Sequence, residues 1–261
     1  MTGRSVAEPI PAVPWCRVVR ADNPGPMTLE GTNTYLVGTA EGTIVVDPGP
    51  LLAEHLDAIT ATDPAPVLAV VTHHHVDHTE ASQEWHRRTG APVRAFDPGQ
   101  CIAADPLVDG QELTFGDVRL QIMHTPGHTG DSICLVGGSA STSVLISGDT
   151  VLGRGTSIVA HPDGRLGDYL ASLERLRAAA RSVPEGMVLL PAHGPVGADA
   201  ATVVEEYIAH RQMRLDQVRA ALAAGAATAQ DVVEIVYADV DKSVWDAARA
   251  TVEAQLAYLQ D

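Results

Sequence analysis

Histidine and aspartate residues dominate the part of the sequence that could do chemistry. The chain contains 11 histidines, and four of them fall in the run HHHVDH at 73–78, directly after the apolar segment VLAVVT. A strand that ends in a loop projects successive side chains in different directions. His73 and His75 can therefore converge on one metal ion, while Asp77 and His78 on the turn reach a second.

The donor types in this run indicate which metal would bind. Imidazole and carboxylate ligands without thiolate suit Zn²⁺, with Mn²⁺ or Fe as alternatives. His74 is expected to point away from the site. A chance cluster or a tag-like tract is the competing interpretation, but the run is internal and follows a predicted buried strand.

Three further residues of these types follow apolar segments later in the chain. His128 ends the sequence TPGH, Asp149 lies in SGDT, and His193 lies in PAHG. Proteins of the α/β class commonly place their chemistry at the carboxyl ends of strands. Each residue alone is better explained as part of a turn, but together with the histidine run they predict a metal site.

Other catalytic chemistries have no support in the sequence. No GxSxG element follows a predicted strand, and the GxGxxG and P-loop patterns are missing, so serine-hydrolase and nucleotide-dependent chemistry are not indicated. Cys16, Cys101 and Cys134 are widely separated and form no CxxC pair. They therefore predict neither a disulfide framework nor a thiolate zinc site.

Composition limits the expected partners. The formal net charge is −16, from 33 acidic and 17 basic residues, whereas broad binding of nucleic acid requires clustered Lys and Arg. Duplex DNA is therefore not an expected partner. No apolar run approaches the roughly 20 residues of a membrane-spanning helix, and the first residues lack the apolar core of a secretion signal. We expect a cytoplasmic protein that does not bind membranes.

Alternating apolar segments and turns predict an α/β fold. Strands are expected near 16–20, 33–38, 43–46, 67–71, 118–123, 143–147 and 187–191. Helices are expected near 51–60, 79–89, 168–183 and 197–225. A capping pattern from Thr228 to Asp231 then begins two or more short helices. We place a domain boundary near residue 226, between a catalytic domain over 1–226 and a C-terminal segment over 227–261.

Four motifs, HHHVDH, TPGHTGDS, SGDTVLG and PAHGPV, resemble in this order the metal-binding motifs of the metallo-beta-lactamase superfamily. The segments most similar to its beta-lactamase-like protein 2 group are 23–38, 148–159 and 193–214. The resemblance covers nearly the whole chain and implies a four-layer αββα sandwich, followed by a small winged-helix-like helical domain. Many relatives have a small Gly-rich pair where this chain has Glu80 and Ala81, a departure that bears on the shape of the adjacent pocket.

The resemblance also divides the seven residues between two zinc ions. One ion would be held by three histidines, His73, His75 and His128. The second ion would be held by Asp77, His78 and His193. Asp149 would bridge the two ions.

Such a site would generate hydroxide at neutral pH from a water that bridges the ions, and this hydroxide would be the nucleophile. Asp77 would orient it while ligating one ion. Arg154, in the loop after Asp149, either contacts an anionic group of the substrate or lies solvated on the surface. The sequence identifies no proton donor for the leaving group.

Two classes of function remain open. The first is hydrolysis, either of an ester-type bond in a small acyl substrate (an ester, thioester or lactone) or of a phosphodiester bond in single-stranded RNA, on which some relatives act. The second is nonenzymatic nucleic-acid binding through the C-terminal segment. The charge of this segment argues against nucleic-acid binding, because residues 228–261 contain seven acidic residues and only two basic ones, Lys242 and Arg249. We expect that segment to pack on the catalytic domain, cover the active-site rim or support a homodimer.

Overall fold

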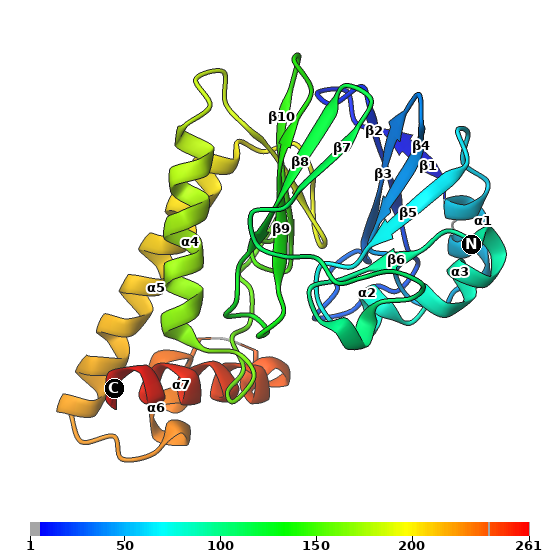
Figure 1. The fold of residues 1–261 in the computed structure, drawn as a ribbon. Coiled ribbons are helices and arrows are strands. Elements are labelled where there is room, and N and C mark those ends of the chain that lie inside the picture. The colour runs from blue at the N-terminus through cyan, green and yellow to red at the C-terminus, as the bar shows by residue number, and fades with distance from the viewer. Residues whose placement is uncertain (1–5, 240, 261) are drawn as a thin grey trace.

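The computed structural model describes residues 6–239 and 241–260, whose strands form two sheets that lie face to face (Figure 1). The first sheet has six strands in the order β1-β2-β3-β4-β5-β6. Their bounds are Ala7–Pro9, Cys16–Arg20, Asn33–Thr39, Gly42–Val46, Pro66–Val70 and Val93–Arg94. The pairs from β1 to β4 are antiparallel, and β4, β5 and β6 pair in parallel.

The second sheet has five strands in the order β11-β10-β9-β8-β7. In chain order, from β7 to β11, their bounds are Glu112–Phe115, Val118–His124, Ile133–Gly138, Ser143–Gly148 and Val188–Pro191. Only β10 and β11 pair in parallel within this sheet. Because side chains alternate along a strand, Tyr35 and Val37 of β3 face the second sheet and pack with Leu120 and Ile122 of β8.

Helices cover the outer face of each sheet (Figure 1). The helices on the first sheet are α1 (Ala53–Thr60) and α3 (Ser82–Thr89), and those on the second are α4 (Leu166–Arg181) and α5 (Ala200–Ala223), while the short α2 (Val76–Thr79) lies at the end of the sheets. Short 3-10 helices occur at Pro98–Gln100 and Lys242–Val244. Leu36, the outward neighbour of Tyr35, packs against Leu56 and Trp85 of the helices. The four-layer αββα fold implied by the resemblance is confirmed.

The C-terminal segment consists of α6 (Ala229–Val236) and α7 (Trp245–Gln260). The predicted cap is present, because the Thr228 side chain accepts from the Asp231 backbone and the Asp231 side chain accepts from the Thr228 backbone. Helix α7 has 16 residues and is longer than the short helices expected. Its residue Val252 packs with Val218 of α5, so α5 belongs to two cores. The boundary near residue 226 stays a prediction.

Four strands were not predicted from the sequence, namely β1, β6, β7 and β9. Strand β9 ends in Gly137 and Gly138, which the sequence pattern presents as a turn. At Gly137 a Cβ would lie 2.1 Å from the carbonyl oxygen of Arg119 on the neighbouring strand. Glycine is therefore required here for the close approach of two backbones, and this does not end the strand.

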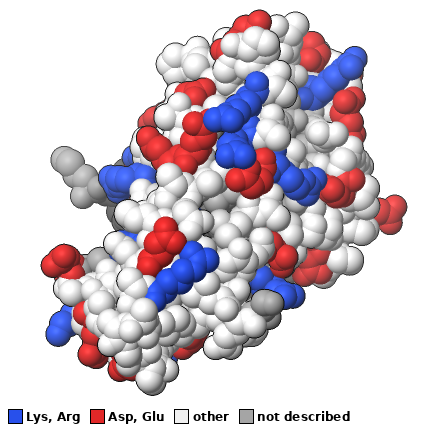
Figure 2. Space-filling model, turned by 90° about the vertical axis from the view of Figure 1, so that its left-hand side faces the viewer, with Lys and Arg blue, Asp and Glu red and all other residues white. Residues whose placement is uncertain are grey.

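Charged side chains on the α4 and α5 face are mixed in sign (Figure 2). Arginines of these helices pair with nearby carboxylates, as in Arg181 with Glu205 and Arg219 with Asp216. Figure 2 accordingly shows no continuous basic surface on this face. Within residues 6–239 and 241–260, no helix is both long and apolar enough to span a membrane.

Candidate metal centre

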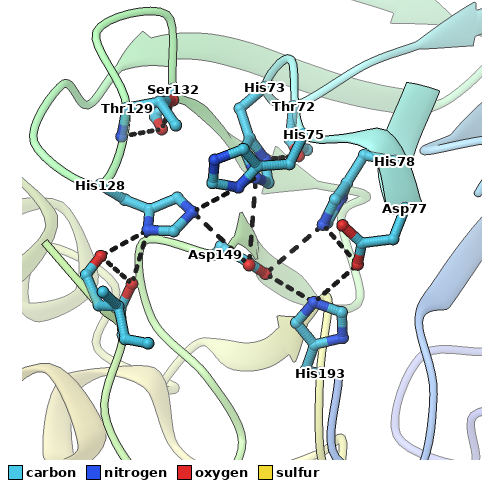
Figure 3. Close-up of polar contacts among 12 residues, drawn as sticks. Thr72, His73, His75, Asp77, His78, His128, Thr129, Ser132, Asp149 and His193 are labelled. Carbon is cyan, nitrogen blue, oxygen red and sulfur yellow. Dashed lines mark hydrogen bonds and ion pairs between the residues drawn. The ribbon is translucent and has the colours of Figure 1, made fainter. Parts of the chain in front are cut away.

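The seven predicted ligands meet at one end of the two sheets (Figure 3). The histidine run follows β5 and continues into α2, the next ligand lies between β8 and β9, and the last two follow β10 and β11. Potential ligand atoms lie within 4.8 Å of one another in each of two groups. The first group is His73, His75, His128 and Asp149, and the second is Asp77, His78 and His193. The resemblance implies the same sets of histidines, with Asp77 in the second set, but it assigns Asp149 to both ions.

Ring nitrogens of three histidines converge in the first group. His75 Nδ1 lies 3.0 Å from His73 Nε2 and 3.1 Å from His128 Nε2. Burial, together with the charges of His128 and His78, lowers the pKa of His75 to about 4. Burial also lowers the pKa of His73 well below its usual value. The rings of His73 and His75 are therefore neutral near pH 7, the form in which imidazole binds a metal.

Neighbouring groups fix which nitrogen of two rings carries the proton. His128 Nδ1 donates to the carbonyl oxygen of Ile158 at 2.6 Å, and in the neutral ring this leaves Nε2 with a free electron pair. The Thr72 hydroxyl donates to Asp47 at 2.8 Å, so it accepts from His73 Nδ1 at 3.1 Å. His73 Nε2 is then also free. Each ring thus directs an unprotonated nitrogen into the cluster.

In the second group, the imidazole of His193 lies close to two carboxylates, Asp77 of the same group and Asp149 of the first. His193 Nε2 lies 3.3 Å from Asp77 Oδ2 and 3.2 Å from Asp149 Oδ1. Burial opposes a charge on His193, but the two carboxylates raise the pKa of its imidazole to about 9. Burial likewise opposes a charge on Asp149, yet His78 and His193 lower the pKa of its carboxyl to about 2. With Oδ1 toward His193 and Oδ2 3.7 Å from His128 Nε2, Asp149 faces both groups.

Two atoms at the centre show that a cation fits between these residues. His78 Nε2 and Asp149 Oδ1 are buried and have no hydrogen-bond partner among the residues that the structure describes. A buried polar atom without a partner is costly. His78 Nε2 lies 3.7 Å from Asp149 Oδ1, and both atoms face the space between the two groups. A bound cation would satisfy both.

Asp47 accepts hydrogen bonds from His78 and from Thr72, the residue before the histidine run. It was not identified from the sequence. Its Oδ2 accepts from His78 Nδ1 at 2.9 Å and from the Thr72 hydroxyl, while its Oδ1 accepts from the Thr72 backbone at 2.7 Å. Asp47 is the first residue of the motif DPGP, which has the composition of a turn after β4. The available signal was a carboxylate at the carboxyl end of a buried strand, beside the strand that carries the histidines. Carboxylates in this position orient metal-binding imidazoles.

Asp47→Asn is expected to lower metal affinity about 10-fold to 100-fold, since it weakens the contact that orients His78. The backbone of Asp47 has a φ of 56°, a conformation that asparagine tolerates, so the fold should persist. Competition with a fluorescent chelator would measure the affinity. Asp57→Asn, at an exposed carboxylate paired with Arg88, is the control. Equal affinities in the two variants would show that Asp47 does not orient the ligand.

The remaining residues singled out from the sequence lie around the cluster. His74 points away as predicted, with Nδ1 2.8 Å from Asp131 Oδ1. Arg154 is exposed and pairs with Glu30 at 2.6 Å. Glu80, at the departure from the resembling family, accepts from the Leu51 backbone at 3.0 Å and so ties α2 to the start of α1.

A pocket of about 170 Å³ opens beside His128 and Asp149. Its walls are mainly apolar, and the apolar side chains include Met27, Leu29, Leu152 and Ile158. Arg154 is the basic residue among those that line it, and its charge is already paired with Glu30. The pocket therefore offers an apolar surface next to the candidate metal ligands.

Known proteins share both the sequence and the fold. The model of the metallo-beta-lactamase superfamily matches residues 27–193, and that of the beta-lactamase associated winged helix domain matches residues 228–261. A beta-lactamase-like protein 2 homolog of Drosophila melanogaster is 31% identical, with 91% of this chain and 85% of that protein covered. An atrochrysone carboxyl ACP thioesterase of Aspergillus chevalieri is 33% identical, with 87% and 75% covered.

Solved structures of other proteins have the same fold as this chain. A beta-lactamase domain protein from Burkholderia ambifaria has a TM-score of 0.78 at 24% identity, with 96% of this chain and 87% of that chain covered. A protein solved in a di-iron-bound form has a TM-score of 0.53 at 27% identity, with 68% and 92% covered. With its family motifs, its four-layer fold and a candidate metal-binding cluster, this chain belongs to the metallo-beta-lactamase superfamily of hydrolases.

Proposed function

We propose that this protein is a dinuclear metal-dependent hydrolase of an ester-type bond, and that thioesters are its preferred class. The observation that carries the proposal is the small apolar pocket beside His128 and Asp149. An acyl chain gains free energy from leaving water for such a surface, whereas a phosphodiester backbone needs unpaired cations. The similarity to an acyl carrier protein thioesterase supports the same class.

The two groups of ligands would hold two divalent ions, zinc or iron. Ions bound there supply hydroxide from water near neutral pH and stabilise negative charge that develops on the carbonyl oxygen. The protein supplies their position through His128, whose ring is fixed by Ile158, and through His78, whose ring is fixed by Asp47.

Asp77 is the residue that we assign to orienting the nucleophile. Its Oδ2 accepts from the Thr32 hydroxyl at 3.0 Å and faces His193 and His78. Burial opposes ionisation, but His78 and His193 hold the pKa of Asp77 far below its usual value, so it stays a hydrogen-bond acceptor at neutral pH. The carboxylate can therefore accept a hydrogen bond from water held beside the cluster and orient it.

Single-stranded RNA is the competing substrate. The paired charges of α4 and α5 provide no continuous basic surface on the face shown in Figure 2. Electrostatic attraction of RNA rests on such a surface, and the chain has a net charge of −16. These observations favour the acyl substrate.

Protein purified without chelator should contain about two transition-metal ions per chain, because two groups of ligands are present. This metal-loaded protein should hydrolyse a neutral thioester, measured by thiol release. Removal of the ions by a chelator should abolish turnover, and their return should restore it. Elemental analysis on the same samples would identify the metal.

Two results would contradict the proposal. A metal content near zero after supplementation with zinc and iron would remove the dinuclear site. Cleavage of single-stranded RNA without any turnover of thioesters, esters or lactones would keep the metal site but replace the substrate class.

A further inference from the structure

A second cavity lies behind the loop that holds His128. Its volume is about 230 Å³, and it is bounded by loop residues 156–158, by α5 and by residues of the C-terminal segment that include Tyr237 and Thr251. Residues 156–158 also line the apolar pocket beside Asp149. One short loop is therefore a wall common to both cavities.

The basic side chains of this cavity come from one stretch of α5. His210, Arg211 and Arg214 all line it. Arg211 is only 2% exposed. Its Nε, the Nε of Arg214 and the Nδ1 of His210 are buried atoms with no hydrogen-bond partner among the described residues.

The contacts that these arginines do make are to uncharged groups. Arg211 donates to the carbonyl oxygen of Ser157 and lies over the ring of Tyr169, 4.9 Å from its centroid. Arg214 donates to the Gln217 side chain at 2.9 Å and to the Val236 carbonyl at 3.3 Å, and it lies over the Tyr237 ring.

Within residues 6–239 and 241–260, no ion pair joins a carboxylate to Arg211 or Arg214, unlike Arg219 further along α5. Burial lowers the pKa of His210, and the neighbouring guanidinium groups of Arg211 and Arg214 lower it further. A buried charge without a counter-charge is costly. The cavity therefore has the electrostatic character of an anion site.

We propose that this cavity is an anion-binding subsite, which takes a carboxylate or phosphate on the part of the substrate remote from the scissile bond. This inference rests on the proposed hydrolase function and narrows its substrate class to anionic thioesters. Guanidinium groups bind both anions through short, charge-assisted hydrogen bonds. Residues 156–158 line both cavities, so this subsite lies next to the pocket at His128, and the proposal requires that one substrate passes over this loop.

Three thioesters test the subsite and distinguish the two sources of the anion. Acetyl-N-acetylcysteamine is neutral, its succinyl analogue has a carboxylate on the acyl side, and acetyl-phosphopantetheine has a phosphate on the thiol side. The metal-loaded wild type should have a KM about tenfold lower or more for at least one anionic thioester than for the neutral one, because a charge-assisted hydrogen bond is gained.

Arg214→Gln should abolish this preference, raise the KM of the anionic thioester by about the same factor and leave its kcat and the neutral thioester within about twofold. Arg219→Gln is the matched control, because it removes the same charge from the same helix at a residue that is paired with Asp216 outside the cavity. Arg211→Lys retains the charge and should retain part of the preference. Equal KM changes for neutral and anionic thioesters in Arg214→Gln, or no change in either, would overturn the subsite.

Inorganic phosphate provides a test that does not depend on turnover. At constant ionic strength, phosphate should raise the Tm of the wild type and of Arg219→Gln by more than that of Arg214→Gln, since binding to the native state stabilises it. Phosphate bound to the metal ions contributes to all three proteins and cancels in the comparison. If no thioester is hydrolysed, the proposed function fails, and this comparison still decides the subsite. An identical shift in all three proteins would refute it.

Discussion

Replacing Asp149 with asparagine is expected to lower turnover by about 1,000-fold or more. Asp149 is the carboxylate that faces both groups of ligands, with Oδ1 3.2 Å from His193 and Oδ2 3.7 Å from His128. Asparagine has nearly the same shape but no charge, so the charge that two cations require between them is lost. Metal stabilisation of a transition state is worth several kcal/mol, and each 1.36 kcal/mol is a factor of ten.

The fold of this variant should persist, because the residue lies after β10, at the end of the sheet, and not in the apolar core. Turnover of the best thioester, metal content and far-UV circular dichroism would be measured together. Asp109→Asn, at a carboxylate paired with Arg175 on the surface, is the control and should behave as wild type. Retention of activity and of two ions in Asp149→Asn would show that the centre has been assigned wrongly.

Deleting residues 228–261 should lower the Tm by about 5 °C or more. The deletion removes Val232 and Val252 from their cluster with Val218 of α5, and it removes Ala254 from the cluster that contains Leu215. The exposed face of α5 would lose roughly 1.5–3 kcal/mol for each large aliphatic side chain left in water. In a domain of this size, 1 kcal/mol corresponds to about 2–4 °C. Thermal unfolding and light scattering would measure the loss and the expected aggregation.

Val252→Ala is a milder version of the same change and should lower the Tm in the same direction by a smaller amount. The deletion should not remove an affinity for duplex DNA, because the segment carries only Lys242 and Arg249 as bases. Tight binding of DNA by the intact chain that weakens steeply with salt and vanishes on deletion would contradict the structural role.

The seven candidate metal ligands could be predicted because histidine and aspartate are chemically distinctive and these residues follow predicted strands. The supporting contacts could not, since they depend on tertiary structure. Nothing in the local sequence of Ile158 indicates that its carbonyl accepts from His128, which lies 30 residues earlier. Arg211 resembles a surface arginine of an Ala-rich helix, and only the packing of α5 on the 156–158 loop buries it.

Some elements of the fold could likewise be predicted from the sequence, and others could not. Strands rich in β-branched residues, such as Gly42–Val46, were predicted with their bounds almost unchanged. The short strand Glu112–Phe115 offers only four residues of pattern, too few to distinguish it from a loop. The helix expected over 79–89 is interrupted, because Glu80 and Ala81 separate α2 from α3. The backbone of Ala81 donates there to the carbonyl oxygen of Gly49 in the preceding loop.

The ligand groups draw on both sheets, since the histidine run follows β5 while Asp149 and His193 follow β10 and β11. Ions held there would bind the native chain and not the unfolded one, so their free concentration enters the folding equilibrium directly. The two sheets could then not separate at this end without releasing the ions. Metal supply in the cell would thus govern resistance to proteolysis, and a chain starved of metal would be degraded sooner as well as being inactive.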